Sequence, residues 1–477
     1  MRYLPWRICN PICNRMRLPV IVLLLAFLVA LPLVASGSGK SGEGSFLIVS
    51  DLHFDPFADP SLVNRLASAD YRQWEQILES SGRSGMGSYG RDAPYPLLKS
   101  ALEAMRDRDP APDLILFGGD FLAHDFRGQY DKYAHDKSDA AYRLFVEKTI
   151  RFLALMFDSR FPSVPIMPTL GNNDADCGDY GVAPGGAFLK MFADVWAPLV
   201  ARGGSPAPFL DTFPVGGYYN VANPAIKGYR IIALNANLFS PKARNCGPDG
   251  DDHGTEELGW LDWNLYRTRL GNGKAWVIYH EPVGVDVYSS LTGGGICHGK
   301  VTMMLKDNYG AMLLQTLEKN ARVVSASFAG HTHMDDFRLD LKGGEPKFFT
   351  HITPSVSPVF GNNPAFQRFI FDRDSGTIRD FSTYVLANFA TARNVSDARW
   401  EMEYDFAKTY GRKEYTTAAL NSLYAELLEQ KALRDSFIRY YASGTGGITT
   451  GENLKALLCG IGNMDADSFA ACYCSEK

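Results

Sequence analysis

Short apolar runs alternate along the chain with longer amphipathic segments. The apolar runs cover residues 46–49, 114–117, 164–170, 229–234, 276–279 and 323–328. Because each run is short and is bounded by glycine and polar residues, each predicts a buried β-strand. Amphipathic segments between them, such as 97–105 and 140–156, predict helices. Strands that alternate with helices predict a layered α/β domain.

The pattern changes after about residue 385. Apolar side chains such as Leu420, Leu423, Leu427 and Phe437 recur there at helical spacing. A stripe of this kind usually packs against a core and carries no chemistry. We therefore expect residues 386–477 to form a mostly helical C-terminal subdomain.

The first 36 residues are typical of an export segment. Four arginines precede an apolar run over residues 18–35, and a Ser/Gly stretch follows it. A basic head, an apolar core and small residues at its end indicate a secretory signal peptide. The run is also just long enough to span a bilayer as an uncleaved anchor. Both alternatives predict a secreted or periplasmic protein, free or anchored by this segment.

Composition and charge exclude several classes of protein. The 477 residues include 46% hydrophobic and 21% charged ones, which is ordinary for a globular protein. The formal net charge is −5, and it becomes −9 without residues 1–36, which hold four arginines and no acid. This balance lacks the basic patch that binds a nucleic-acid polymer.

Six cysteines follow the export segment, namely Cys177, Cys246, Cys297, Cys459, Cys472 and Cys474. An even number in an oxidising compartment predicts up to three disulfides, with 15 possible pairings that the sequence does not separate. A thiolate zinc site is the competing interpretation. It is disfavoured because the spacing lacks paired CxxC units.

Polar side chains follow five of the predicted strands. The candidate ligands are Asp51 and His53, Asp120, Asn172, His280, and His331 and His333. Ligands of α/β sheets bind outside the carboxyl ends of the strands, so we expect these side chains to converge. Carboxylate, imidazole and amide groups together suit zinc, manganese or iron. Each group alone is a common turn residue, so the ordered set is what indicates a metal site.

This ordered set resembles the calcineurin-like metallophosphoesterases, whose blocks run DxH, GD, GN(H/N)(D/E), H and GHxH. More narrowly, residues 119–125 are similar to the GDxxAHD block of the acid sphingomyelinase-like phosphodiesterases. Residues 280–284 resemble the HxPPG block of that branch, and residues 353–366 resemble its TPSxTP…NP segment. The resemblance covers about residues 45 to 441.

The resemblance implies a four-layer α/β/β/α sandwich with a C-terminal helical subdomain. We expect a signal peptide or anchor over residues 1–36 and a linker over 37–45. A metallophosphoesterase catalytic domain over 46–385 and the helical subdomain over 386–477 then complete the chain.

The resemblance also implies a binuclear metal site. Two divalent ions, with zinc favoured and manganese or iron as alternatives, would be bridged by Asp120. Asp51, His53 and His333 would complete one coordination sphere. Asn172, His280 and His331 would complete the other. The implied reaction is hydrolysis of a phosphodiester or phosphoanhydride bond by attack of a metal-bridging hydroxide.

One position departs from the superfamily pattern. The histidine that usually follows the GN pair is replaced by Asn173. An amide cannot protonate a leaving alkoxide, so the general acid has to be another group. The resemblance assigns this role to His124, with a structural role beside a ligand as the alternative. Asn173 is expected to donate a hydrogen bond to a phosphate oxygen.

The sequence leaves the substrate open among sphingomyelin-like lipids, nucleotides and related phosphodiesters. The first catalytic strand follows the export segment almost directly, without the saposin-like domain of true acid sphingomyelinases. This favours a soluble substrate, although Phe54 and Phe121 beside the ligand blocks keep a lipid open. Membrane contact is expected only through the N-terminal segment, if that segment is uncleaved. The alternative functions are a phosphomonoesterase or polyphosphatase, and a non-catalytic extracellular binding module.

Overall fold

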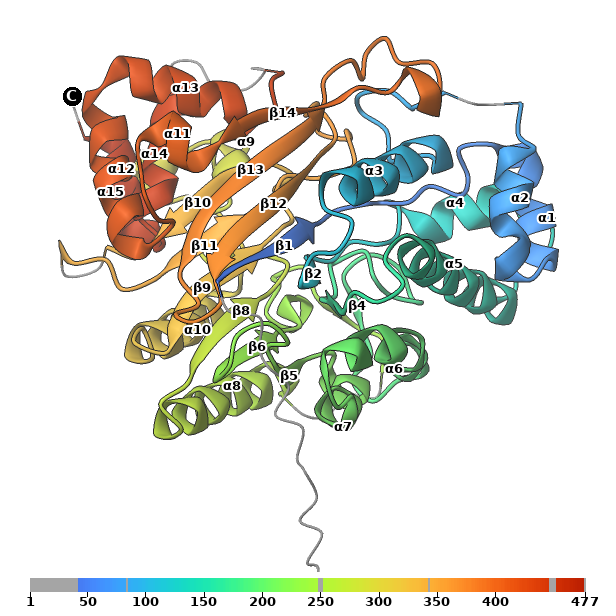
Figure 1. Cartoon of the computed structure of the whole chain (residues 1–477), viewed down its shortest axis with the longest axis horizontal. Coiled ribbons are helices and arrows are strands. Elements are labelled where there is room, and N and C mark those ends of the chain that lie inside the picture. Colours follow the sequence, from blue (N-terminus) through green and yellow to red (C-terminus); the bar gives the residue numbers. More distant parts are fainter. Residues whose placement is uncertain (1–41, 83–84, 248–251, 342–343, 446–451, 476–477) are drawn as a thin grey trace, which may run out of the picture. The chain divides into compact units, whose positions relative to one another are not determined.

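Two six-stranded β-sheets face each other at the centre of the protein (Figure 1). The computed structural model describes residues 42–475, except for 83–84, 248–251, 342–343 and 446–451. The first sheet has the order β14-β13-β12-β1-β2-β3, and the second has the order β10-β11-β9-β8-β6-β5.

The strands of the first sheet are β1 (Glu43–Val49), β2 (Leu114–Phe117), β3 (Ile166–Pro168), β12 (Ala365–Asp372), β13 (Ile378–Leu386) and β14 (Trp400–Asp405). Those of the second are β5 (Tyr219–Ala222), β6 (Tyr229–Ala233), β8 (Lys274–Ile278), β9 (Val324–Ala329), β10 (Asp336–Leu339) and β11 (Phe349–Ile352). A separate pair joins β4 (Gly181–Val182) to β7 (Arg244–Asn245).

An aromatic core joins the two sheets. The ring of Phe46 in β1 stacks on Phe369 of its own sheet, with a centroid distance of 4.7 Å. The same ring lies 4.9 Å from Trp276 and 5.7 Å from Phe328 of the second sheet. All four side chains are buried. Burial of such large rings is the main favourable contribution to packing one sheet on the other.

Ten α-helices that precede β9 in the described residues flank the two sheets, some in contact with a strand and others mainly with neighbouring helices. They are α1 (Val63–Ser68), α2 (Trp74–Glu79), α3 (Tyr95–Arg108), α4 (Phe126–Tyr133), α5 (Asp139–Arg160), α6 (Ala187–Val200), α7 (Ala207–Gly216), α8 (His253–Leu270), α9 (Val287–Gly293) and α10 (Asp307–Lys319). Helices α3 and α6 pack on the first sheet, whereas α8 packs on the second and contacts α10. The predicted four-layer α/β/β/α sandwich is therefore confirmed.

The six predicted strands are β1, β2, β3, β6, β8 and β9, and the two predicted helices lie within α3 and α5. Strands β1, β2 and β3 are parallel, and so are β6, β8 and β9. Because parallel strands end at the same edge of a sheet, each set brings its following loops together.

Two boundaries differ from the sequence prediction. Strand β1 begins at Glu43, inside the predicted linker, because Glu43 to Ser45 pair with β12 across an antiparallel ladder. The C-terminal segment is mostly helical, with α11 (Phe406–Tyr410), α12 (Thr417–Glu429), α13 (Lys431–Tyr441), α14 (Glu452–Gly462) and α15 (Ala466–Cys474). It also supplies β14, which pairs with β13 and so extends the first sheet beyond residue 386.

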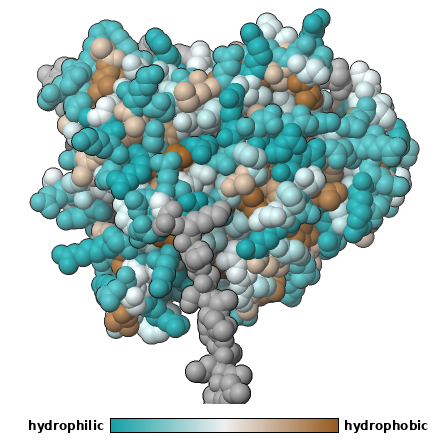
Figure 2. Space-filling view, viewed as in Figure 1, coloured by the Kyte–Doolittle hydropathy of each residue, from teal (hydrophilic) through white to brown (hydrophobic). Residues whose placement is uncertain are grey.

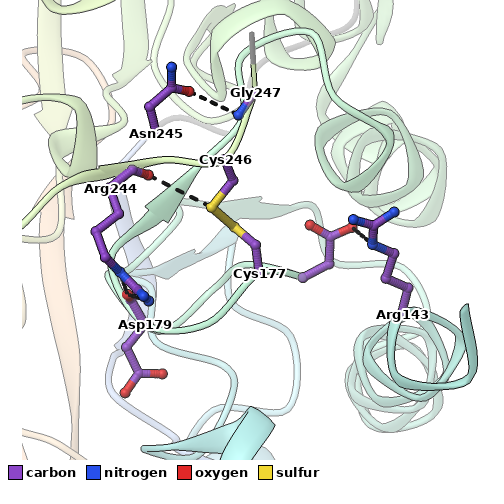
Figure 3. Close-up of a disulfide and its surroundings, with 8 residues drawn as sticks. Arg143, Cys177, Asp179, Arg244, Asn245, Cys246 and Gly247 are labelled. Carbon is purple, nitrogen blue, oxygen red and sulfur yellow. Dashed lines mark hydrogen bonds and ion pairs between the residues drawn. A yellow bond between two sulfur atoms is a disulfide. The ribbon is translucent and has the colours of Figure 1, made fainter. Parts of the chain in front are cut away.

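Three disulfides connect the six cysteines that follow the export segment. Cys177 pairs with Cys246, Cys297 with Cys474, and Cys459 with Cys472. Figure 3 shows the first of these, which joins the loop after β3 to the end of β7. Disulfides of this number are typical of extracytoplasmic proteins.

The face of the molecule in Figure 2 is mainly hydrophilic, with small and separate apolar patches. Across the described part of the chain, no helix is long and apolar enough to cross a bilayer. The predicted signal peptide or anchor over residues 1–36 lies outside the described residues.

Candidate metal centre

The loops that follow the strands have an unusual backbone conformation. Asp51, His53, Asp120, His331 and His333 all have φ between 42° and 71°. Residues other than glycine rarely adopt this left-handed region, because it brings Cβ close to a carbonyl oxygen. Such conformations persist where the surrounding structure enforces them, and they cluster at functional sites. The strand-end loops are thus shaped to aim these particular side chains.

The first cluster of candidate ligands consists of Asp51, His53 and His333. Their potential ligand atoms lie within 4.8 Å of one another. Asp51 Oδ1 is 3.3 Å from His333 Nε2 and 3.8 Å from His53 Nε2. The two imidazole Nε2 atoms are 3.1 Å apart. All three side chains are buried.

The second cluster consists of Asp120, His280 and His331, again within 4.8 Å. Asp120 Oδ2 is 3.1 Å from His280 Nε2 and 3.4 Å from His53 Nε2 of the first cluster. The Asp120 carboxylate therefore lies between the two clusters. That arrangement suits a bridging ligand, because a carboxylate has two oxygens to share.

Hydrogen bonds orient the histidines. His53 Nδ1 donates to the Leu122 carbonyl at 3.0 Å, and His280 Nδ1 donates to the Gly118 carbonyl at 2.7 Å. Because Nδ1 carries the proton of the neutral ring, the lone pair of Nε2 is directed into the cluster. Histidines that bind metals are usually held in this way.

Among the buried polar atoms at the clusters that have no hydrogen-bond partner are two from candidate ligands of the second ion. They are Nε2 of His280 and Oδ1 of Asn172, whose Nδ2 donates to Asn173 Oδ1. A buried polar atom without a partner is costly in free energy. Both atoms are lone-pair donors that a divalent cation can accept, so this donor set fits two metal ions.

The carboxylates of the two clusters shift the pKa values of the neighbouring histidines. Burial alone would lower the pKa values of His53 and His280, but Asp120 and Asp51 outweigh it and raise them to about 9 and about 10. Burial lowers the pKa of His331 to about 4 and that of His333 to about 3. The ionised carboxylates thus hold protons on two histidines in the places where a cation would bind.

The carboxylate of Asp174 ties two of these loops together. It accepts hydrogen bonds from the backbone N–H groups of Asp120, Phe121, Leu122 and Gly171, at 2.8 to 3.2 Å. The loops approach so closely that a Cβ on Gly171 would lie 2.2 Å from Asp120 Oδ1. Asp174 therefore fixes the position of Asp120 relative to Asn172.

His124 lies beside the first cluster. Its ring stacks on His53 with a centroid distance of 4.1 Å. Its Nδ1 donates to Asp92 Oδ1 at 2.9 Å, and its backbone N–H donates to Asp92 Oδ2 at 2.8 Å. The ring is thereby fixed through Nδ1, which leaves Nε2 available for proton transfer. The side chain is 36% exposed, so solvent and a substrate can reach it.

Asn173 contacts Asp120 directly. Its backbone N–H donates to Asp120 Oδ1 at 2.7 Å, and its side chain is buried. The structure therefore brings both residues of the predicted catalytic pair, His124 and Asn173, next to the two clusters of candidate ligands.

Comparisons with known proteins agree with this geometry. The model of the family described as calcineurin-like phosphoesterase matches residues 44–335, and that of the acid sphingomyelin phosphodiesterase C-terminal region matches residues 347–477.

The chain belongs to the calcineurin-like phosphoesterase family. Together the two matches confirm the acid sphingomyelinase-like branch. This phosphoesterase is a metal-dependent phosphoric diester hydrolase, and its family implies two divalent metal ions.

Several relatives are similar over nearly the whole chain. The human acid sphingomyelinase-like phosphodiesterase 3b is 25% identical over 94% of both chains. A cyclic GMP-AMP phosphodiesterase of Mus musculus is 26% identical over 90% of this chain and 91% of the relative. Sphingomyelinase phosphodiesterase D of Dictyostelium discoideum is 24% identical over 94% of this chain and 98% of the relative. Among solved structures, a dimetal phosphatase from Danio rerio has a TM-score of 0.43 at 13% identity, covering 76% of this chain and 99% of that one.

Several residues of the phosphoesterase site were not assigned a role by the sequence. Asp92 holds His124, and Asp174 holds Asp120. Asp174 is the last residue of the GN(H/N)(D/E) block, so the sequence pointed to this position but not to its role. Phe54 and Phe121, which kept a lipid substrate open, are fully buried core residues. An aromatic side chain that is exposed beside this site is Phe360.

Proposed function

We propose that this phosphoesterase is an extracytoplasmic two-metal phosphodiesterase that acts on a soluble, nucleotide-like substrate. The observation that carries the proposal is the position of Asp120 between two clusters of buried ligand atoms. A relative that is named a cyclic GMP-AMP phosphodiesterase supports a nucleotide substrate. Zinc is the favoured metal, because imidazole and carboxylate ligands suit it.

In this proposal the seven candidate residues hold the two ions. Asp51, His53 and His333 bind one, with Asp120 as the shared ligand. The other ion is bound by Asn172, His280 and His331 together with Asp120. When bound, two such ions lower the pKa of water and neutralise the charge of the phosphate.

The remaining residues act on the substrate. His124, held by Asp92, donates a proton from Nε2 to the leaving oxygen, which Asn173 cannot do. Asn173 donates its amide N–H to a phosphate oxygen. Two oriented donors of this kind stabilise the charge that develops on the phosphate and on the leaving group.

The location and the domain division belong to the same proposal. Three disulfides support folding outside the cytoplasm. We propose that residues 1–36 direct export, as a cleaved signal peptide or as an anchor, and that the protein is secreted or periplasmic. The catalytic domain over 46–385 and the subdomain over 386–477 would then act as one exported unit.

The experiment is a substrate panel with zinc-loaded protein and, in parallel, manganese-loaded protein. It compares bis-(p-nitrophenyl) phosphate, nucleoside di- and triphosphates, cyclic nucleotides, sphingomyelin in micelles and phosphomonoesters. We expect turnover of the phosphodiesters with a preference for nucleotides. A preference for phosphomonoesters would indicate a phosphomonoesterase, and a preference for sphingomyelin would indicate a sphingomyelinase.

The role of His124 has its own test. A general acid matters most for a leaving group that binds a proton tightly, so His124→Ala should lose about 100-fold more rate on an alkyl ester than on an aryl ester. His124→Asn, which keeps a polar side chain, serves as a second variant. Equal losses on both esters would show that His124 only supports the metal cluster.

A further inference from the structure

Phe360 stands at the edge of the metal centre. Its ring centroid lies 4.6 Å from that of His333 and 6.0 Å from that of His124, nearly perpendicular to both rings. Its loop is fixed to the site by backbone hydrogen bonds, since Ser355 N–H donates to the His333 carbonyl and Ser357 N–H donates to the Asp51 carbonyl. The ring therefore has a defined position relative to the candidate ligands and the proposed acid.

More than half of this side chain is exposed. Phe360 is 52% accessible, whereas Phe54, Phe57 and Phe121 near the same site are buried. A large aromatic side chain that is held in place yet exposed beside a catalytic histidine offers a surface on which a planar ring can stack. Because it lies on the His124 side, it faces the part of the substrate that departs.

A polar pocket of about 460 Å³ begins one residue beyond Phe360. It is lined by Tyr89, Gly361, Asn363, Asn388, Thr391 and Arg399, among others. Hydrogen bonds fix its walls: Tyr89 Oη donates to Asn363 Oδ1 at 2.6 Å, and Asn363 Nδ2 donates to the Ser443 carbonyl at 2.7 Å. We refer to it as the Tyr89–Arg399 pocket.

The charged side chain among the described residues that line this pocket is the exposed Arg399. Glu403 lies nearby, with Oε1 at 3.0 Å from the position of a Cβ on Gly444, and burial raises its pKa to about 8. None of the described residues that line it is a carboxylate. The backbone of Arg399 is held on both sides, because its N–H donates to Asn388 Oδ1 and its carbonyl accepts from Ala387 N–H. Within the described part of the chain, no hydrogen bond or ion pair engages the Arg399 guanidinium. An arginine of this kind is suited to a phosphate group.

We propose that Phe360 and the Tyr89–Arg399 pocket bind the leaving group of the substrate, and that this group is a nucleoside carrying a second phosphate. The nucleobase stacks on Phe360, and the second phosphate contacts Arg399. The inference rests on the proposed phosphodiesterase function and adds to it a site for the departing half of the substrate. The pocket lining is of mixed polarity, since two alanines and two glycines accompany the amides, the hydroxyls and Arg399. The feature that favours a phosphate over an acyl chain is therefore the arginine.

The test compares three substrates on zinc-loaded full-length protein. They are a dinucleotide with a terminal phosphate, the same dinucleotide without it, and the ethyl ester of a nucleoside monophosphate, whose leaving group has no ring. Phe360→Ala should raise KM for both dinucleotides by about 10- to 100-fold, with kcat nearly unchanged, because base stacking is lost. Phe360→Ala should leave KM for the ethyl ester nearly unchanged. Phe360→Tyr, which keeps an aromatic ring, should have KM values close to those of the wild type for all three substrates.

Arg399→Gln should raise KM about tenfold only for the dinucleotide with the terminal phosphate, because only that substrate has the group it contacts. Trp263→Ala is the matched control for loss of an exposed aromatic ring, since Trp263 is 56% exposed on α8. It should change none of the three KM values. Thermal unfolding verifies that each variant is folded.

The outcomes separate this inference from the function on which it rests. If the wild type hydrolyses all three substrates and both variants leave every KM unchanged, the leaving-group site is wrong and the phosphodiesterase stands. Equal effects of Phe360→Ala on the ethyl ester and the dinucleotides would also overturn it. Faster hydrolysis of micellar sphingomyelin than of either dinucleotide would overturn the nucleoside assignment. No turnover of any phosphodiester, including bis-(p-nitrophenyl) phosphate, would instead refute the proposed function.

Discussion

Replacing Asp174 with asparagine should damage both the stability and the metal centre of this phosphoesterase. Each of the two carboxylate oxygens accepts two backbone N–H groups, from Phe121 and Leu122 at Oδ1 and from Asp120 and Gly171 at Oδ2. The asparagine oxygen can replace one of the two acceptors. Its NH2 group would then face two N–H donors, so two hydrogen bonds are lost.

The magnitude follows from the kind of bonds that are lost. Burial and the neighbouring Asp120 raise the pKa of the Asp174 carboxyl to about 7, so removal of its charge costs little. Each buried N–H left without an acceptor costs about 1–3 kcal/mol, so two of them lower the free energy of unfolding by about 2–6 kcal/mol. The shifted loops carry Asp120 and Asn172. Loss of such a supporting residue typically weakens metal binding about 10- to 100-fold. We expect kcat at saturating zinc to fall about 100-fold, because the ligands no longer hold their positions.

Urea unfolding monitored by tryptophan fluorescence measures the stability, and competition with a zinc chelator measures the affinity. Asp176→Asn is the matched control, because Asp176 lies two residues away and pairs with Arg143 at 3.5 Å, outside the ligand loops. The free energy of unfolding of the control variant should lie within about 0.5 kcal/mol of the wild-type value. If Asp174→Asn also stays within that range and keeps full activity, Asp174 does not position the metal centre.

Three further predictions concern protons and cross-links. Zinc binding at pH 7.5 should release protons from His53 and His280, because their metal-free pKa values are about 9 and about 10. Titration calorimetry in buffers of different ionisation enthalpy measures the number of protons released. A binding enthalpy that does not depend on the buffer would contradict the prediction. Replacing Cys177 and Cys246 with serine opens a loop of 69 residues and should lower the free energy of unfolding by up to about 4 kcal/mol. Denaturant titrations measure this loss, and an unchanged denaturant concentration at the unfolding midpoint would contradict it. Burial raises the pKa of Glu403 from 4.5 to about 8, so ionisation of this carboxyl lowers the stability of the folded protein as the pH rises between these values. Glu403→Gln should therefore raise the free energy of unfolding by up to about 3 kcal/mol at pH 7.5 and by less than about 1 kcal/mol at pH 5. An equal gain at both pH values would refute this prediction.

Much of the fold could be predicted from the sequence because the strands that hold the site are short, apolar and parallel. Their apolar runs are buried on both faces, and each ends in a glycine or a polar residue. Strand β14 was missed because it is not a continuous apolar run like the six predicted strands. Its sequence, Trp400–Asp405, alternates apolar and charged residues, which is the pattern of a strand with one exposed face. It is defined by pairing with β13, which the local sequence does not encode.

The candidate ligands could be predicted because their residue types and order resemble a known family. The roles of the residues that support these ligands could not be predicted from the sequence. Asp92 accepts the backbone N–H of His124, and Asp174 accepts that of Asp120, each from a loop that is distant in sequence. Only the folded chain brings these groups together. The exposure of Phe360 is likewise a property of the tertiary structure, since Phe54 and Phe121 beside the ligand blocks are equally apolar in sequence but buried.

The most direct test of the two-metal site is the metal content of the purified protein, measured by plasma mass spectrometry after dialysis against zinc-free buffer. The site built around Asp120 predicts two divalent ions per wild-type chain, together with turnover of bis-(p-nitrophenyl) phosphate. Asp120→Ala should bind fewer than one ion per chain and lose that turnover. Fewer than one ion in the wild type, or two ions retained in Asp120→Ala, would contradict the account.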